Sequence, residues 1–129
     1  MRIHHVGYLV KKLDKARLSF ERLGYRVTQE PVYDDYRKID ICFMELDGYV
    51  IELVSPAAPD SVVSELIKQY RNSPYHICYI AEHFDEEAAD LCKKGFVQIG
   101  EPCPAPAIGQ KRVLFLMSPA IGIIELLEA

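Results

Sequence analysis

The stretch HVGYLV at residues 5–10 returns as HICYIA at residues 76–81, which is 71 positions later in the chain. The pair GY at residues 24–25 returns as GF at residues 95–96 with the same offset. A period of this length is too long for a solenoid repeat, whose units span about 20 to 50 residues. The sequence therefore predicts a duplicated structural module.

Hydrophobic periodicity predicts the same order of elements in each half of the chain. The first half begins with a strand and a helix that starts at Asp14, and three strands follow. The dipeptide Asp47-Gly48 is a strong signal for a hairpin turn between the last two of these strands. The predicted strands of this half cover residues 3–10, 25–29, 39–46 and 49–54, with a polar loop at residues 31–37.

The second half repeats this pattern, and the two halves together make an α+β fold of two βαβββ modules. Its predicted elements are strands at residues 75–81, 96–99, 112–117 and 121–127, a helix at residues 85–94 and a proline-rich loop at residues 101–110. Between the halves we expect a linker helix that is capped by Asp60 or Ser61. The chain then forms one domain, 1–129, with a first module at 1–55, a linker at 56–73 and a second module at 74–129.

Each module carries a histidine in its first strand and a glutamate in its last strand. His5 and His76 open the first strands, and the triplet IEL places Glu52 and Glu125 at matching positions near the ends of the modules. Apolar residues flank all four, and a buried carboxylate is costly unless it is paired or bound to a cation. Taken singly, each residue is more often a core or surface residue, but the symmetric set favours a divalent metal site.

Other polar residues are weaker candidates for a site. His4 is predicted to point to the face opposite His5, because neighbouring strand residues alternate. His83 precedes a helix and is expected to be exposed. The four cysteines have no Cys-x-x-Cys spacing and are expected to be reduced thiols in a cytoplasmic protein.

Composition and charge exclude several classes of function. Fifteen basic and nineteen acidic residues give a net charge of −4 spread along the chain, which argues against a nucleic-acid partner. No stretch approaches the roughly 18 apolar residues of a membrane span. We expect a soluble protein whose partner is a small molecule.

These residues resemble the vicinal oxygen chelate superfamily, which includes glyoxalase I, methylmalonyl-CoA epimerase, extradiol dioxygenases and bleomycin-resistance proteins. The resemblance covers the whole chain and implies a curved, eight-stranded, metal-binding cup of the glyoxalase type. Its ligand positions fall on His5, Glu52, His76 and Glu125, as in bacterial glyoxalase I. The segments IELVSPAAPDS, PYHICYI and GQKRVLFLMSP are closer to methylmalonyl-CoA epimerase. That group carries an acid/base glutamate before the third strand, where this chain has Asp34, Asp35 and Tyr36.

The set of two imidazoles and two carboxylates suits Co²⁺, Ni²⁺, Zn²⁺, Mn²⁺ or Fe²⁺. A substrate with adjacent oxygens would bind the ion, which would stabilise an enediolate after a proton α to a carbonyl is removed. Glu125 is the expected base, and Glu52 faces it from the other module. Tyr36, Lys111 and Arg112 are candidate substrate contacts, although an ordinary exposed basic pair is the commoner role for the last two.

The leading interpretation is an epimerase or isomerase of an acyl-CoA or a similar acid. A lactoylglutathione lyase is the first alternative, and a sequestering protein of the bleomycin-resistance type without enzymatic activity is the second. An extradiol dioxygenase is less favoured, because Glu52 occupies a position that such an enzyme would leave open. Exposed strand edges and the resemblance also predict a homodimer.

Overall fold

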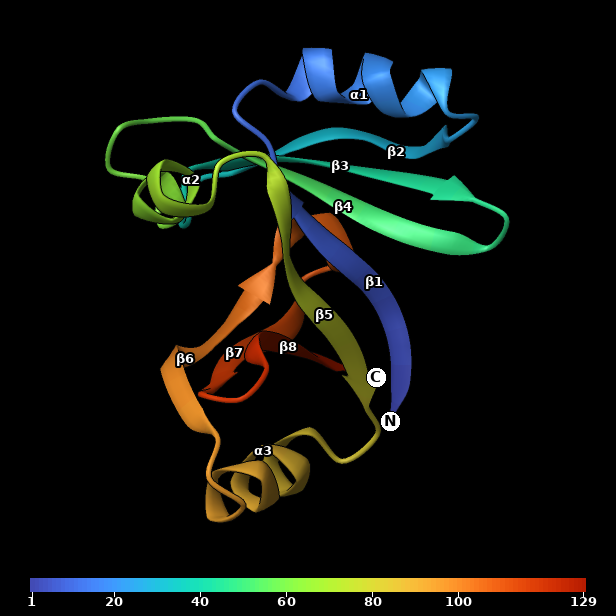
Figure 1. Ribbon diagram of the computed structural model, residues 1–129. Coiled ribbons are helices and arrows are strands. Elements are labelled where there is room, and N and C mark those ends of the chain that lie inside the picture. The colour runs from blue at the N-terminus through green and yellow to red at the C-terminus, as the bar shows by residue number, and fades with distance from the viewer. The chain divides into compact units, whose positions relative to one another are not determined.

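The computed structural model describes residues 1–129 and contains two runs of elements in the order βαβββ (Figure 1). The first run consists of β1 (Arg2–Leu9), α1 (Leu13–Arg22), β2 (Arg26–Asp34), β3 (Ile39–Leu46) and β4 (Tyr49–Pro56). Helix α2 (Ser64–Tyr70) connects it to the second run. That run consists of β5 (Ser73–Ala81), α3 (Phe84–Lys93), β6 (Val97–Ala105), the short 3₁₀ helix η1 (Pro106–Ile108), β7 (Lys111–Ser118) and β8 (Gly122–Glu128). The predicted fold class of two βαβββ modules is confirmed.

The chain divides into two compact units that share strand β1. The N-terminal unit is Val6–Pro74, and the C-terminal unit combines Met1–His5 with Tyr75–Ala129. Within the N-terminal unit the strand order is β2-β3-β4-β1, and within the C-terminal unit it is β1-β5-β8-β7-β6. The first residues of β1, including His5, are therefore grouped with the second module rather than with their own.

The hydrogen-bond register of the two modules repeats around the two glutamates. In the N-terminal unit Glu52 pairs with Gly7 of the parallel strand β1 and with Phe43 of the antiparallel strand β3. In the C-terminal unit Glu125 pairs with Cys78 of the parallel strand β5 and with Phe115 of β7. The duplication seen in the sequence thus extends to the backbone neighbours of both carboxylates.

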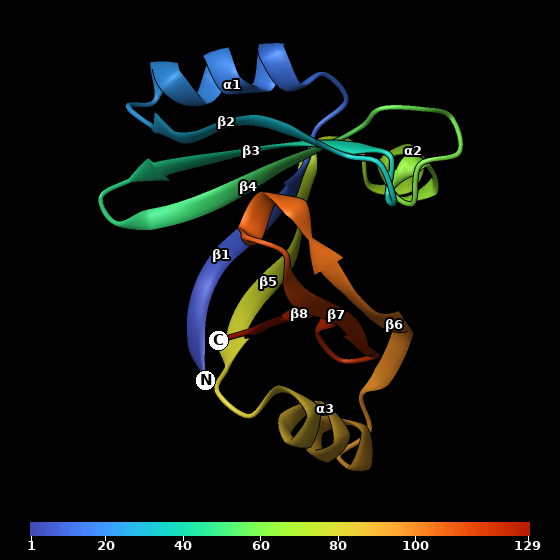
Figure 2. The same ribbon diagram turned by 180° about the vertical axis from the view of Figure 1, so that it is seen from behind.

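One helix covers the sheet in each unit and closes its apolar core. Leu13, Ala16 and Phe20 of α1 pack on the core residues of the N-terminal unit, which include Met44 and Leu53. Figure 2 shows α1 running along β2 at one side of that sheet. In the C-terminal unit α3 supplies core residues in the same way, through the buried cluster Ala81, Phe84, Ala88, Leu114, Leu116, Ile124 and Leu126. No helix is long and apolar enough to cross a bilayer.

The predicted loops after the second strand of each module were wrong in the same way. Strand β2 continues past Pro31 to Asp34, and β6 continues past Pro102 to Ala105. Proline has no N–H for a sheet ladder and is tolerated at an edge strand or a bulge. Both strands lie at the edge of their unit's sheet, and the register shifts beside each proline, between Gln29 and Val32 and between Ile99 and Cys103.

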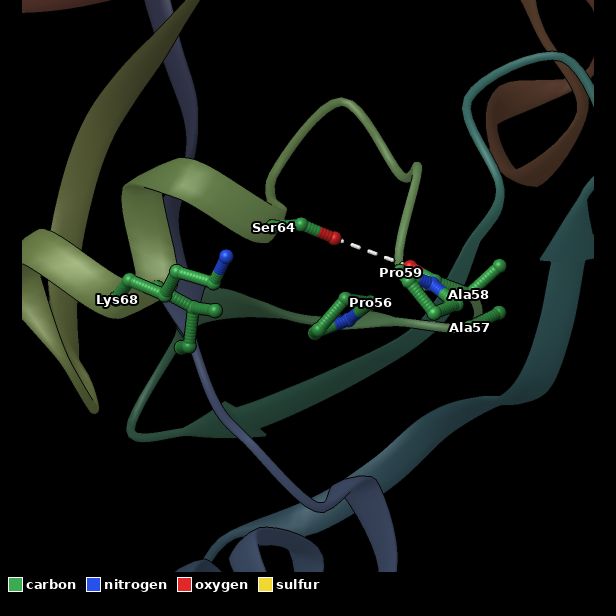
Figure 3. A pocket seen from close by; sticks show the side chains of 7 residues that line it. Pro56, Ala57, Ala58, Pro59, Ser64 and Lys68 are labelled. Atoms are coloured by element: carbon green, nitrogen blue, oxygen red, sulfur yellow. Dashed lines mark hydrogen bonds between the residues drawn. The ribbon is translucent and has the colours of Figure 1, made fainter.

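The predicted capping of the linker helix was also wrong. Helix α2 begins at Ser64, after Val63, and has no side-chain cap. Asp60 instead forms an ion pair with Lys38, and the Ser61 hydroxyl donates to the carbonyl of Arg37. The Ser64 hydroxyl donates to the carbonyl of Ala58 (Figure 3), and both residues line a hollow of about 380 Å³ beside α2. The linker is therefore fixed by contacts with its own loop and with the β2–β3 connection.

The equivalent core leucines Leu53 and Leu126 are fully buried, one in each unit. Replacing either with alanine removes buried methyl groups and leaves a cavity, so we expect a loss of about 2–5 kcal/mol in the free energy of unfolding. Urea denaturation followed by circular dichroism would measure this. Leu23→Ala, at a leucine that is 68% exposed, is the matched control and should change stability by less than about 1 kcal/mol. Equal effects at buried and exposed leucines would contradict the core assignment.

Candidate metal centre

Three ligand atoms from three strands converge in the C-terminal unit. His5 comes from β1, His76 from β5 and Glu125 from β8. The Nε2 atoms of the two histidines are 3.1 Å apart. The Oε2 atom of Glu125 lies 2.8 Å from Nε2 of His76 and 3.6 Å from Nε2 of His5. Three of the metal ligands predicted from the sequence thus converge within this one unit.

The three residues are buried away from water, and none of them is more than 3% exposed. Two neutral imidazoles and a carboxylate that face one point with lone pairs repel one another unless protons or a cation lie between them. A divalent cation would accept electron pairs from all three atoms at once. Imidazole nitrogen and carboxylate oxygen are ligands that zinc and other first-row divalent ions share. The donor set therefore fits a divalent metal.

The electrostatics of Glu125 favour an ionised carboxylate. Burial is the largest single effect and raises the pKa of this carboxyl, but the hydrogen bonds and the charges of His5 and His76 together lower the pKa to about 2. A carboxyl that stays ionised to such low pH is suited to binding a cation.

His4 contacts the site although strand alternation predicted it on the opposite face. Its Nδ1 atom lies 2.7 Å from Nδ1 of His5, and its side chain is half-buried. Nδ1 is the ring nitrogen nearer the main chain, so consecutive histidines can meet through these atoms at the flank of a strand. A hydrogen bond to Nδ1 fixes the orientation of the ring and leaves Nε2 facing Glu125 and His76. Sequence reasoning missed this role, and the His-His dipeptide was the available signal.

Aromatic side chains flank the imidazole of His76, and a thiol lies near His4 and His5. The ring of Tyr75 lies edge-on at 4.4 Å between centroids, and the ring of Phe115 lies edge-on at 5.4 Å. Cys78 is fully buried and offers its sulfur within 4.8 Å of the ligand atoms of His4 and His5. These residues exclude water from the trio. Phe115 was missed by sequence reasoning, although Phe43 precedes it at the equivalent place in the first module.

Glu52, the fourth predicted ligand, is buried in β4 of the N-terminal unit and is 5% exposed. Its partner across the parallel ladder is Gly7, two residues beyond His5 in β1. Residues two apart in a strand share a face, and directly paired residues project to the same side of a sheet. The Glu52 side chain of β4 therefore projects to the same side of the sheet as Gly7. Tyr8 projects to the other side.

Two of the predicted substrate contacts, Tyr36 and Lys111, lie at exposed positions, and Arg112 is half-buried. Tyr36 is 74% exposed in the turn after β2, and its ring stacks with the guanidinium of Arg37. Asp34, in the same segment, is buried and accepts hydrogen bonds from the backbone and the guanidinium of Arg37. Asp35 accepts from the Tyr33 hydroxyl. The segment therefore holds its buried carboxylate in an internal ion pair.

Lys111 and Arg112 begin β7 in the C-terminal unit. Lys111 is exposed. The Arg112 guanidinium binds Asp85 through two hydrogen bonds of 3.1 Å, binds Glu128 at 2.9 Å and stacks on the ring of Phe84. These contacts lower the pKa of Glu128, chiefly through its hydrogen bond with Arg112. Arg112 joins α3 to the sheet, and its predicted substrate role has no support in these contacts.

Comparison with solved structures places this fold among known proteins. A hypothetical protein from Bacillus halodurans C-125 has a TM-score of 0.85 and 20% identity, over 99% of this chain and 94% of that one. The methylmalonyl-CoA epimerase of Mycobacterium tuberculosis has a TM-score of 0.83 and 22% identity, over 98% of this chain and 87% of that one. These likenesses show that the fold is of the glyoxalase type.

Sequence comparison shows the family. The mitochondrial methylmalonyl-CoA epimerase of Bos taurus is 27% identical over 131 residues, which cover 99% of this chain and 74% of that protein. The mitochondrial enzyme of Homo sapiens is 26% identical, and the match again covers 99% of this chain and 74% of that protein. The model of the Glyoxalase/Bleomycin resistance protein/Dioxygenase superfamily matches residues 4–115. From this match over most of its length, the chain belongs to the Glyoxalase/Bleomycin resistance protein/Dioxygenase superfamily.

Proposed function

We propose that this protein is a divalent-metal-dependent epimerase or isomerase that moves a proton α to the carbonyl of an acyl thioester or a similar acid. The observation that carries the proposal is the buried convergence of His5, His76 and Glu125. The similarity to methylmalonyl-CoA epimerases of Bos taurus and Homo sapiens supports this reaction class. A structural neighbour from Streptomyces coelicolor is described in complex with 2-nitronate-propionyl-CoA, which supports a CoA thioester as the substrate class.

His5, His76 and Glu125 would hold the ion, and we propose Glu52 as the fourth ligand. The support for Glu52 is its repeat equivalence to Glu125, its burial and its register opposite Gly7. A bound divalent ion would supply the positive charge that stabilises the oxygen of the deprotonated acyl group. A carboxylate buried at each of two equivalent positions is otherwise costly, which also supports a shared cation.

Glu125 and Glu52 would be the acid/base pair of the reaction. Epimerisation removes a proton from one face of a carbon and returns a proton to the other face, so two carboxylates of opposite modules suit it. We propose Glu125 as the base and Glu52 as the carboxylate that acts on the other face of the carbon.

The segment before β3 differs from the pattern that the resemblance implies. The resemblance to methylmalonyl-CoA epimerase implies a glutamate there, whereas this chain has Asp34 in an ion pair with Arg37. Asp34 is fully buried, and both of its carboxylate oxygens accept hydrogen bonds from Arg37. We therefore propose the class of acyl thioesters rather than methylmalonyl-CoA alone.

The first prediction concerns the ion itself. The purified protein should contain close to one equivalent of a divalent transition metal by elemental analysis. His76→Gln should reduce this content at least tenfold, because it removes one of three converging donors. His83→Gln, at an exposed histidine, is the matched control. Thermal unfolding of the variants checks that they are folded. Metal content that is the same in both variants would contradict the assignment of His76.

The second prediction concerns the proton transfer. In D₂O the protein should exchange deuterium into the α position of methylmalonyl-CoA or a related acyl thioester, as seen by mass spectrometry. Glu52→Gln should lower the exchange rate by about 10²-fold or more, the scale of general acid–base catalysis. The hemithioacetal of methylglyoxal is the comparison substrate. Exchange into that compound alone would instead support a lactoylglutathione lyase, and full activity of Glu52→Gln would contradict the role of Glu52.

The third prediction concerns His4. Its contact with Nδ1 of His5 orients a proposed ligand, and loss of such a partner typically costs 10- to 100-fold in metal affinity. His4→Phe should therefore weaken metal binding by about that factor, measured by competition with a chromophoric chelator. His4→Gln keeps a hydrogen-bonding group and should lose less. Equal affinities of both variants and the parent protein would show that this contact does not support the site.

A further inference from the structure

A groove runs along helix α1 in the N-terminal unit, with a volume of about 540 Å³. It lies between α1 and the end of β1, on the side to which Tyr8 and Val10 project. This volume is within the range of sites for small organic molecules, roughly 300–1,000 Å³. The groove is therefore large enough for a ligand.

One end of the groove is strongly basic. Lys11, Lys12 and Lys15 line it and are exposed, and none of their ammonium groups takes part in an ion pair. Lys38 and Lys68, in the same unit, each have a carboxylate partner. The net charge of the chain is −4, whereas the three unpaired lysines give this groove a positive charge. Like charges held close together favour an anion between them.

The other end of the groove is apolar. Tyr8 and Phe20 pack edge-on with ring centroids 5.1 Å apart and form part of its wall. Leu23, just beyond α1, continues the wall and is 68% exposed. At about 1.5 Å per helical residue, Lys12 and Leu23 are separated by roughly 16 Å along the helix. The groove is therefore elongated, with a cationic end and an apolar end.

This groove is separate from the residues of the proposed function. It uses the Tyr8 face of β1, whereas Glu52 pairs with Gly7 and projects from the opposite face. The groove residues also belong to the Val6–Pro74 unit, and the trio of His5, His76 and Glu125 belongs to the other unit. A ligand in the groove is thus additional to the substrate of the metal centre.

We propose that the groove binds an amphipathic phosphate monoester, with its dianionic phosphate at the three lysines and its apolar body along Tyr8, Phe20 and Leu23. Lysine ammonium groups act as point charges and bind phosphate without requiring a planar, two-pronged partner. Three of them match a phosphate dianion better than a single carboxylate. The exposed apolar wall then contributes roughly 25 cal/mol per Å² of surface that the ligand covers.

The test uses decyl phosphate below its micellar concentration and measures its binding to the chain of residues 1–129 by isothermal titration calorimetry. We expect saturable binding of one equivalent, with changes in the amide NMR signals of Tyr8 and Phe20. The double variant K12Q/K15Q should bind at least tenfold more weakly. K93Q, at an exposed lysine of α3 that does not line the groove, is its control and should bind normally.

The apolar end is tested by a second pair of variants. Ser19→Trp should fill the groove and weaken binding at least tenfold, while Leu18→Trp, at an exposed neighbour that does not line it, should not. Inorganic phosphate and decanol should each bind at least tenfold more weakly than decyl phosphate. Absence of saturable binding, or equal binding by K12Q/K15Q, by Ser19→Trp or by inorganic phosphate, would overturn the proposal. Equal binding of decanoate would overturn the choice of phosphate. None of these measurements depends on catalysis.

Discussion

The structure of the C-terminal unit depends on one constraint: three polar groups are held against each other in a place without water. A buried imidazole pair and a carboxylate can persist only if each lone pair and each proton has a partner. The contacts of 2.8 and 3.1 Å place the three ligand atoms where one cation could be shared by all of them. Aromatic edges from Tyr75 and Phe115 close the surroundings of His76, and His4 supports His5 from behind. The strands are thus arranged so that binding groups face inward with little freedom to turn away.

The duplicated pattern made three residues of the candidate site and the bounds of one strand predictable from the sequence. His and Glu in equivalent strands identified His5, His76 and Glu125, because strand alternation and the repeat both constrain where such residues project. Strand β3 was located to the residue, since its hydrophobic run ends at the Asp47-Gly48 turn, where both residues have positive φ. Positive φ is a conformation that glycine adopts readily and aspartate tolerates.

What the sequence did not reveal depends on tertiary neighbours. Prolines in β2 and β6 were read as loop signals, although at a sheet edge a missing N–H costs little. The linker helix lacks the cap predicted for it, because it begins only at Ser64. Asp60 pairs with Lys38, and the Ser61 hydroxyl accepts from the N–H of Val63 in the turn before the helix. Strand alternation describes where side chains project, but it does not describe how far a ring nitrogen reaches, and it therefore missed the contact between His4 and His5. Arg112 was predicted to contact the substrate, but it binds the carboxylates of Glu128 and Asp85, which lie 16 and 27 residues away in the sequence.

The division of β1 between the two units has a consequence for how such a chain could have arisen. The second module holds an imidazole and a carboxylate of its own, yet its other imidazole comes from residue 5, at the far end of the chain. One module alone cannot assemble the trio. A single-module ancestor would have needed a second copy of itself to lend that strand, so its site would have existed only in the associated form. When two copies are joined in one polypeptide, the association of the two modules becomes intramolecular. The site then forms independently of protein concentration.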